Sequence, residues 1–290
     1  MKAKKWYPYV LLIPTLVIII LFIYYPAVDA FKTSLYRNSV FGNRVHYVGL
    51  KNFIALFHDP EYISTLRTTF IYTIFTVSFT ILASFLISLP LSENKKRIKI
   101  YRTLIFLPYA VSPAIAGTLW SFLLDPLVGQ VNYVFLKVFG LQIKWLISTP
   151  YALYSIIFAS VWKIMPFDVI FYIASIQSVP SELLESAKID GANAFTRTWK
   201  IIFPLVSPIT FYLIIMNLVS VMFSSFAIID VMTKGGPGTY TNTMIYKLYL
   251  DAFTNHRTGF ASAQSVVMFV LMAIVTILYF KFGQKQVHYE

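Results

Sequence analysis

Long apolar runs alternate with shorter polar stretches along the whole chain. Six runs approach or exceed the length of about 20 residues that an α-helix needs to cross the hydrocarbon core of a bilayer. They cover residues 7–28, 66–91, 101–124, 151–176, 204–232 and 261–282. A helix satisfies its own backbone hydrogen bonds, for which lipid offers no partner. The pattern therefore predicts an all-α polytopic membrane protein with about six transmembrane helices.

The basic residues of the polar stretches predict how these helices are oriented. Lysine and arginine cluster before the first run, between the second and third runs, and after the last run, as Lys2, Lys4, Lys5, Lys95, Lys96, Arg97, Lys99, Arg102, Lys281 and Lys285. With six spans all three clusters fall on one side, which the positive-inside rule makes the cytoplasm. We therefore expect both termini to be cytoplasmic.

The composition supports a membrane protein and excludes several other classes. Of the 290 residues, 58% are hydrophobic and only 12% are charged, whereas a soluble protein has about 25% charged residues. The net charge of +12 lies in clusters beside apolar runs, where it orients a membrane protein rather than binding nucleic acid. The chain has no cysteine, its histidines lack metal-ligand spacing, and it has no G-x-x-x-x-G-K-[ST] loop for ATP. No linker divides the chain, so we predict one transmembrane domain over residues 1–290.

The segment 177–203 is a polar interruption on the predicted cytoplasmic side. Its sequence indicates two short amphipathic helices on either side of Asp190-Gly191, where glycine permits a turn that a residue with a Cβ resists. Two interpretations are open at this point. The segment is either an ordinary connector resting on the membrane surface or a docking element for a partner protein.

A motif in this segment favours the docking element. Glu185-Ser186-Ala187, followed by Gly191, Ile201 and Phe203-Pro204, resembles the "EAA" signature of binding-protein-dependent ABC transporter permeases. All spacings match, with Ser186 in place of Ala and Phe203 in place of Leu. In that family the loop forms a coupling helix that docks on the ATPase. The resemblance implies this coupling role for Glu182, Glu185, Ser186, Ala187, Asp190, Gly191 and Ala192.

Further short motifs, spread over nearly the whole chain, resemble one narrower class of ABC permeases. Short motifs look like carbohydrate-type permeases of the maltose-permease class: Leu107-Pro108, Ser112-Pro113, Gln177-Ser178-Val179-Pro180 and Gly235-Gly236-Pro237-Gly238. Other stretches, among them 158–163 and 263–267, are similar to permease subunits of sn-glycerol-3-phosphate importers. The resemblance implies a type I ABC importer permease fold in a bacterial cytoplasmic (inner) membrane.

The resemblance also implies a role and a set of partners. Such a chain forms half of a translocation pathway, here for sn-glycerol-3-phosphate delivered by an extracytoplasmic binding protein. It pairs with a second, homologous permease subunit and with two copies of an ATP-binding-cassette ATPase. ATP and magnesium then belong to the ATPase, so we expect no cofactor, metal site or catalytic residue in this chain, which is not itself an enzyme.

Two alternatives remain open. Within the class, the chain serves a neutral sugar or oligosaccharide instead of a phosphate. Outside it, the chain is an intramembrane enzyme acting on lipid, which would need paired carboxylates or a His/Ser set at one membrane depth. The sequence shows neither arrangement.

Lys163 and Asp168 place charges inside the fourth run. Lys163 lies about 12 residues into it, hence about 18 Å deep at 1.5 Å per residue, and an ionisable group at that depth marks a functional-site hypothesis. Pro166 lies between the two and favours a kink. Lys163 pairs with Asp168 or a partner subunit's carboxylate, or binds the substrate phosphate, or extends to the interface. Asp168 is expected to be a structural partner, because a carboxylate repels phosphate.

The fifth run carries a polar face. Asn217, Ser220 and Ser224 are three and four residues apart, so they share one side of a helix. Hydrogen bonding between helices is one interpretation, since Ser and Asn commonly do this in membranes. Lining the pathway for a hydroxyl-bearing substrate is the other. Together with Lys163 they are the candidate substrate-pathway residues.

The orientation can be tested directly because the chain is free of cysteine. A single cysteine at Ser92 should react with a membrane-impermeant thiol reagent only after the membrane is opened, because the second connection faces the cytoplasm. Labelling of intact cells or spheroplasts measures this. Reaction from the outer side of a closed membrane would contradict the topology.

Overall fold

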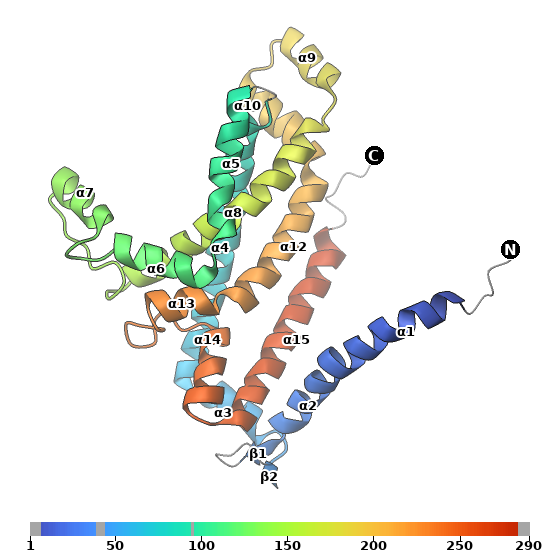
Figure 1. The fold of residues 1–290 in the computed structure, drawn as a ribbon, viewed down its shortest axis with the longest axis vertical. Helices are drawn as coiled ribbons and strands as arrows, with labels where there is room; N and C mark the ends of the chain where they lie inside the picture. Colours follow the sequence, from blue (N-terminus) through green and yellow to red (C-terminus); the bar gives the residue numbers. More distant parts are fainter. Residues whose placement is uncertain (1–6, 39–43, 94–95, 284–290) are drawn as a thin grey trace. The chain divides into compact units, whose positions relative to one another are not determined.

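The computed structural model of the protein describes residues 7–38, 44–93 and 96–283 (Figure 1). The chain forms two compact units, which we describe separately. The first contains the described residues of the ranges 1–63 and 247–271, and the second those of the ranges 64–246 and 272–290.

The first unit holds the N-terminal helices and the segment leading into the last helix. Its elements are α1 (Tyr7–Ile19), the π-helix η1 (Ile20–Tyr24), α2 (Tyr25–Ser34), β1 (Tyr36–Asn38), β2 (Arg44–Tyr47), α3 (Lys51–His58), the start of α4 (Pro60–Leu91), the end of α14 (Met244–Tyr249), the π-helix η3 (Leu250–Thr254) and the first part of α15 (Thr258–Gly283). The antiparallel pair β1–β2 was absent from the all-α prediction. Strands of three and four residues are too short for their alternation to stand out in a sequence.

A group of charges centred on the buried Asp251 joins several segments of the first unit. Asp251 is fully buried, and its carboxylate accepts hydrogen bonds from Gln264 Nε2 at 2.6 Å and Asn255 Nδ2 at 3.0 Å. The Lys247 ammonium lies 3.7 Å from Asp251 and donates to Glu61 Oε1 at 2.8 Å. Because buried charges need paired and hydrogen-bonded partners, these contacts tie the start of α4 to η3 and α15.

The second unit is built around α8. Its elements are the rest of α4, α5 (Lys96–Ala110), α6 (Pro113–Leu123), α7 (Gln130–Phe139), α8 (Tyr151–Gln177), α9 (Ser181–Ile189), α10 (Ala194–Arg197), the π-helix η2 (Thr198–Ile202), α11 (Phe203–Leu205), α12 (Ser207–Ser224), α13 (Phe226–Met232), the start of α14 and the end of α15. Helix α8 packs against α5, α6, α12 and α13, so it lies at the centre of this unit.

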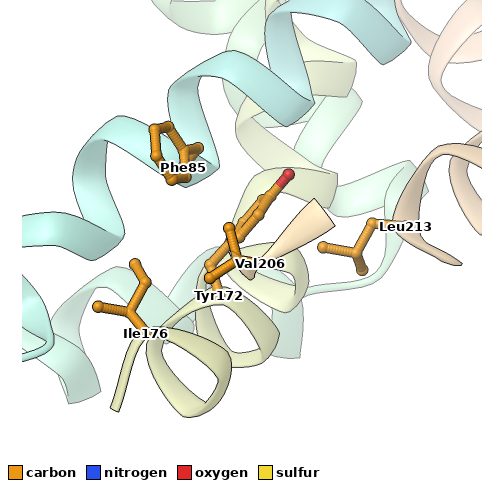
Figure 2. Close-up of a cluster of buried hydrophobic side chains, with 5 residues drawn as sticks. All are labelled: Phe85, Tyr172, Ile176, Val206 and Leu213. Atoms are coloured by element: carbon orange, nitrogen blue, oxygen red, sulfur yellow. The ribbon is translucent and has the colours of Figure 1, made fainter. Parts of the chain in front are cut away.

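An aromatic and aliphatic cluster packs together α4, α8 and the start of α12 in the second unit. The predicted topology places this cluster toward the cytoplasm. Figure 2 shows Tyr172 and Ile176 of α8 gathered with Phe85, Val206 and Leu213. The Tyr172 hydroxyl donates to Thr210 Oγ1 at 3.0 Å, as a buried phenol requires a partner. The cluster therefore joins α4, α8 and α12.

The spanning helices follow the apolar runs with one clear correction. Among the described residues, five helices are long and apolar enough to cross a membrane, and the bent pair α5–α6 makes a sixth if it counts as one span. The predicted third span, 101–124, is this pair, bent by 101°. Pro113 disfavours helical backbone at the residue before it. Ser112 is accordingly extended, and its hydroxyl accepts from the Ile115 N–H at 3.3 Å to cap α6.

The limits of the other spanning helices differ from the predicted runs by smaller amounts. The first span continues through η1 and α2 to Ser34, and the second and sixth begin at Pro60 and Thr258, ahead of their apolar runs. The predicted fifth span, 204–232, divides into α12 and α13 on either side of Ser225. Helices extend into flanking polar residues that a hydropathy pattern leaves out, which accounts for the early starts.

Candidate functional site

A cavity of about 220 Å³ opens in the second unit beside α8. It brings together all four residues predicted for the substrate pathway, although they come from two helices. Its lining comes from α4, α5, α6, α8, α12 and α13: Tyr72, Tyr109, Pro113, Ser160, Lys163, Ile164, Phe167, Met216, Asn217, Ser220, Val221, Ser224, Ser225 and Ile228. The wall is thus aromatic and aliphatic with a few hydroxyl, amide and ammonium groups, the usual character of a small-molecule site.

The Lys163 ammonium is held at the break between α5 and α6. Its Nζ donates to the Tyr109 carbonyl at 2.9 Å and lies 4.7 Å from the centre of the Tyr109 ring. That ring stacks on Phe167 with centroids 5.4 Å apart. The carbonyls at the C-terminal end of a helix carry partial negative charge and attract a cation. An ammonium has three donors, and the carbonyl takes one, so two can serve a ligand in the cavity.

The proposed ion pair between Lys163 and Asp168 does not form. Asp168 is fully buried on α8, and its Oδ2 accepts from Asn217 Nδ2 of α12 at 2.6 Å. The two side chains leave an ideal helix about 140° apart, because five residues advance 500°. Asp168 is therefore the hydrogen-bond partner of the Asn217 amide, while Lys163 bonds to the Tyr109 carbonyl of α5.

Three lining groups were missed by the sequence analysis. The Tyr72 hydroxyl and Ser160 Oγ are 2.7 Å apart, and Ser160 also donates to the Ile156 carbonyl at 2.7 Å. Tyr109 supplies both a carbonyl and a ring to Lys163. A tyrosine or serine within an apolar run carries no signal of its own, whereas the spacing of Asn217, Ser220 and Ser224 does.

The segment predicted to couple to an ATPase, residues 177–203, forms the expected helix, turn and second helix. Gly191 has φ +81°, and the Ala192 N–H returns to the Ala187 carbonyl at 2.9 Å, which closes α9 in the manner of a glycine C-terminal cap. Asn193 then caps α10 through a 2.8 Å hydrogen bond from the Thr196 N–H. The turn therefore needs the positive φ that glycine supplies.

The predicted coupling residues are mostly solvent-facing. Glu182, Glu185, Ser186, Asp190 and Gly191 are exposed, while Ala187 and Ala192 are half-buried. Apolar side chains are exposed on the same segment: Leu183, Ile189 and Phe195. A polar loop with several large exposed apolar side chains has the character of an interaction surface.

Residues 68–288 match the family model of the binding-protein-dependent transport system inner membrane component. The chain belongs to this family, and the predicted class, a carbohydrate-type ABC transporter permease, is confirmed. It is 38% identical over 287 residues to the sn-glycerol-3-phosphate transport system permease protein UgpA of Escherichia coli O157:H7, covering 99% of this chain and 97% of that protein. It is 36% identical over 286 residues to UgpA of Agrobacterium fabrum (strain C58 / ATCC 33970), with the same coverage.

Solved structures show the same fold at lower identity. A bacterial ABC transporter involved in the import of the acidic polysaccharide alginate has a chain with TM-score 0.85 and 22% identity, covering 97% of this chain and 96% of that one. A bacterial alginate ABC transporter in complex with an alginate pentasaccharide-bound periplasmic protein gives TM-score 0.83 at 23% identity, covering 95% and 93%. The predicted ABC permease fold is thereby confirmed. The chain is a multi-pass inner-membrane permease subunit of an ABC sugar importer.

Proposed function

We propose that this chain forms half of the translocation pathway of an importer for sn-glycerol-3-phosphate. The observation that carries the proposal is the Lys163 ammonium in the wall of a largely apolar cavity, in a chain similar over 99% of its length to an sn-glycerol-3-phosphate permease. A phosphate crossing at that depth needs a compensating cation, because an unpaired charge in a low-dielectric environment is very costly. The neighbouring hydroxyl and amide groups suit the glycerol hydroxyls.

A neutral sugar or oligosaccharide is the second candidate. The aromatic rings of Tyr72, Tyr109 and Phe167 and the serines of α8 and α12 favour it, since these groups bind hydroxylated ligands without any charge. The two candidates differ in the role of Lys163. A neutral hydroxyl can accept a hydrogen bond from the ammonium, whereas a phosphate adds the attraction between opposite charges.

The proposal extends to the partners. A binding protein delivers the substrate from outside, a second homologous permease completes the pathway, and two ATPase copies dock on the segment around α9. ATP and magnesium are bound by the ATPases and both termini of this chain lie in the cytoplasm. The exposed Leu183, Ile189 and Phe195 support docking there, because an apolar patch on a polar loop gains free energy when a partner covers it.

Replacing Lys163 by Met should reduce sn-glycerol-3-phosphate uptake. The change keeps most of the apolar stem and removes a charge-assisted hydrogen bond of about 1.5–3 kcal/mol, roughly a ten- to hundredfold loss of apparent affinity. Uptake kinetics of the assembled importer measure this. Lys137→Met is the matched control, because Lys137 also lies 4.7 Å from a tyrosine ring but on α7, away from the cavity. Normal uptake by an assembled Lys163→Met importer would rule out the phosphate role.

Replacing Gly191 by Val should uncouple the permease from its ATPase. A β-branched residue strongly resists φ +81°, so the end of α9 would change course. The space beside Gly191 is open, and Gly191→Asn should be tolerated because Asn adopts positive φ more readily. Pull-down of the ATPase and substrate uptake should both fall in the Val variant while membrane insertion persists. Equal ATPase binding and uptake in the two variants would refute the coupling role.

A further inference from the structure

The hydrogen bond between Asp168 and Asn217 joins a fully buried acid to a residue of the cavity wall. Asp168 is 0% exposed and Asn217 is 3% exposed. Their contact, Asn217 Nδ2 to Asp168 Oδ2 at 2.6 Å, is a short hydrogen bond for a nitrogen donor. Asp168 Oδ1 has no hydrogen-bond partner among the described residues, so Asn217 is the group that this acid holds.

This contact decides which end of the Asn217 amide a ligand meets. An amide has a donor end and an acceptor end fixed in one plane. An unprotonated Oδ2 offers Asn217 only an acceptor, so the NH₂ end of Asn217 faces Asp168, as the Nδ2–Oδ2 hydrogen bond shows. Asn217 also lines the cavity, and the end left for a ligand there is the carbonyl Oδ1.

We infer that Asp168 is a positioning residue. It orients the Asn217 side chain so that Oδ1 accepts a hydrogen bond from a hydroxyl group of the substrate. The dianionic phosphate group of sn-glycerol-3-phosphate only accepts hydrogen bonds, so the glycerol hydroxyls are the donors that can meet Oδ1. Lys163 and Asn217 then recognise the two ends of a polyol phosphate, the anion and a hydroxyl. Ser220 and Ser224, on the same face of α12, extend the polar wall.

The inference rests on the proposed function and predicts hydroxyl discrimination. The probes are sn-glycerol-3-phosphate, 3-hydroxypropyl phosphate, which lacks the central hydroxyl, and 2-hydroxypropyl phosphate, which lacks the terminal one. In the complete importer, uptake efficiency should be about tenfold higher for sn-glycerol-3-phosphate than for at least one analogue, the value of one well-made hydrogen bond.

Variants separate positioning from a merely structural role. Asp168→Leu removes the acceptor, lets the amide turn over, and should bring the discrimination ratio close to one. Asn217→Leu should do the same, and the double variant should lose no more discrimination than either single change. Asp168→Asn keeps the size of the side chain but can present Asn217 with either a donor or an acceptor, so it no longer fixes the Asn217 amide and should lower the ratio while uptake persists. Lys163→Met should lower uptake of all three phosphates alike and leave the ratio unchanged.

The outcomes are distinct. If Asp168→Leu lowers uptake of all three phosphates by one factor and keeps the ratio, Asp168 is structural and the inference is overturned. If Asp168→Leu does not assemble, Asn217→Leu decides. A retained ratio in the Asn217→Leu variant overturns the inference. A lost ratio in that variant, together with a lowered ratio in Asp168→Asn, supports it. A native importer that takes up the phosphates without discrimination overturns the inference alone. One that takes up none of them overturns the proposed function as well.

Discussion

Lipid supplies no hydrogen-bond partners, so each polar group placed in a spanning helix must find its partner within the protein. Helix α8 meets this requirement twice, with an ammonium and a carboxyl group five residues apart. Lys163 bonds to the end of α5 at the Tyr109 carbonyl, and Asp168 bonds to α12 at Asn217. Because the two side chains point about 140° apart, these bonds hold α8 to two different neighbours. The cavity is lined by these three helices together with α4, α6 and α13. Lys163 and Asn217 both line it, so their remaining donors and acceptors are available to a ligand.

The segment that follows the turn at Gly191 is packed against α4, which in turn contacts α8. Phe85 of α4 contacts Tyr172 of α8 with ring centroids 5.5 Å apart, and it also contacts Trp199 and Phe203, which follow the coupling segment, at 5.8 and 5.3 Å. Protein interiors are close-packed, so a displacement of one ring requires its neighbours to move. If an ATPase docks on α9 as proposed, a force applied there would pass to α4 and α8 through these packed rings.

The spanning helices could be predicted because each one leaves an apolar stretch of about 20 residues in the sequence. The apolar runs located the spans and the EAA-like spacing located the coupling turn at Gly191. The sharp bend at Ser112-Pro113 was missed because apolar character continues on both sides of it, and only the local proline chemistry distinguishes a break from a continuous helix. The polar face of Asn217, Ser220 and Ser224 was visible as spacing on one helix. The hydrogen-bond partners of Lys163 and Asp168 could not be predicted in this way. Tyr109 is 54 residues from Lys163 and Asn217 is 49 residues from Asp168 along the chain, and only the packing of the helices brings each pair together.

The account depends on the cavity beside α8 serving an anionic polyol rather than a neutral one. The most direct measurement is ATP-driven uptake by the complete native importer in proteoliposomes, supplied with its binding protein and labelled sn-glycerol-3-phosphate. Excess unlabelled glycerol or a neutral disaccharide is present as competitor. We predict concentrative, saturable uptake of the phosphate that neither competitor reduces. Uptake of the phosphate that either neutral competitor abolishes, or no accumulation of the phosphate above its equilibrium level, would contradict the account.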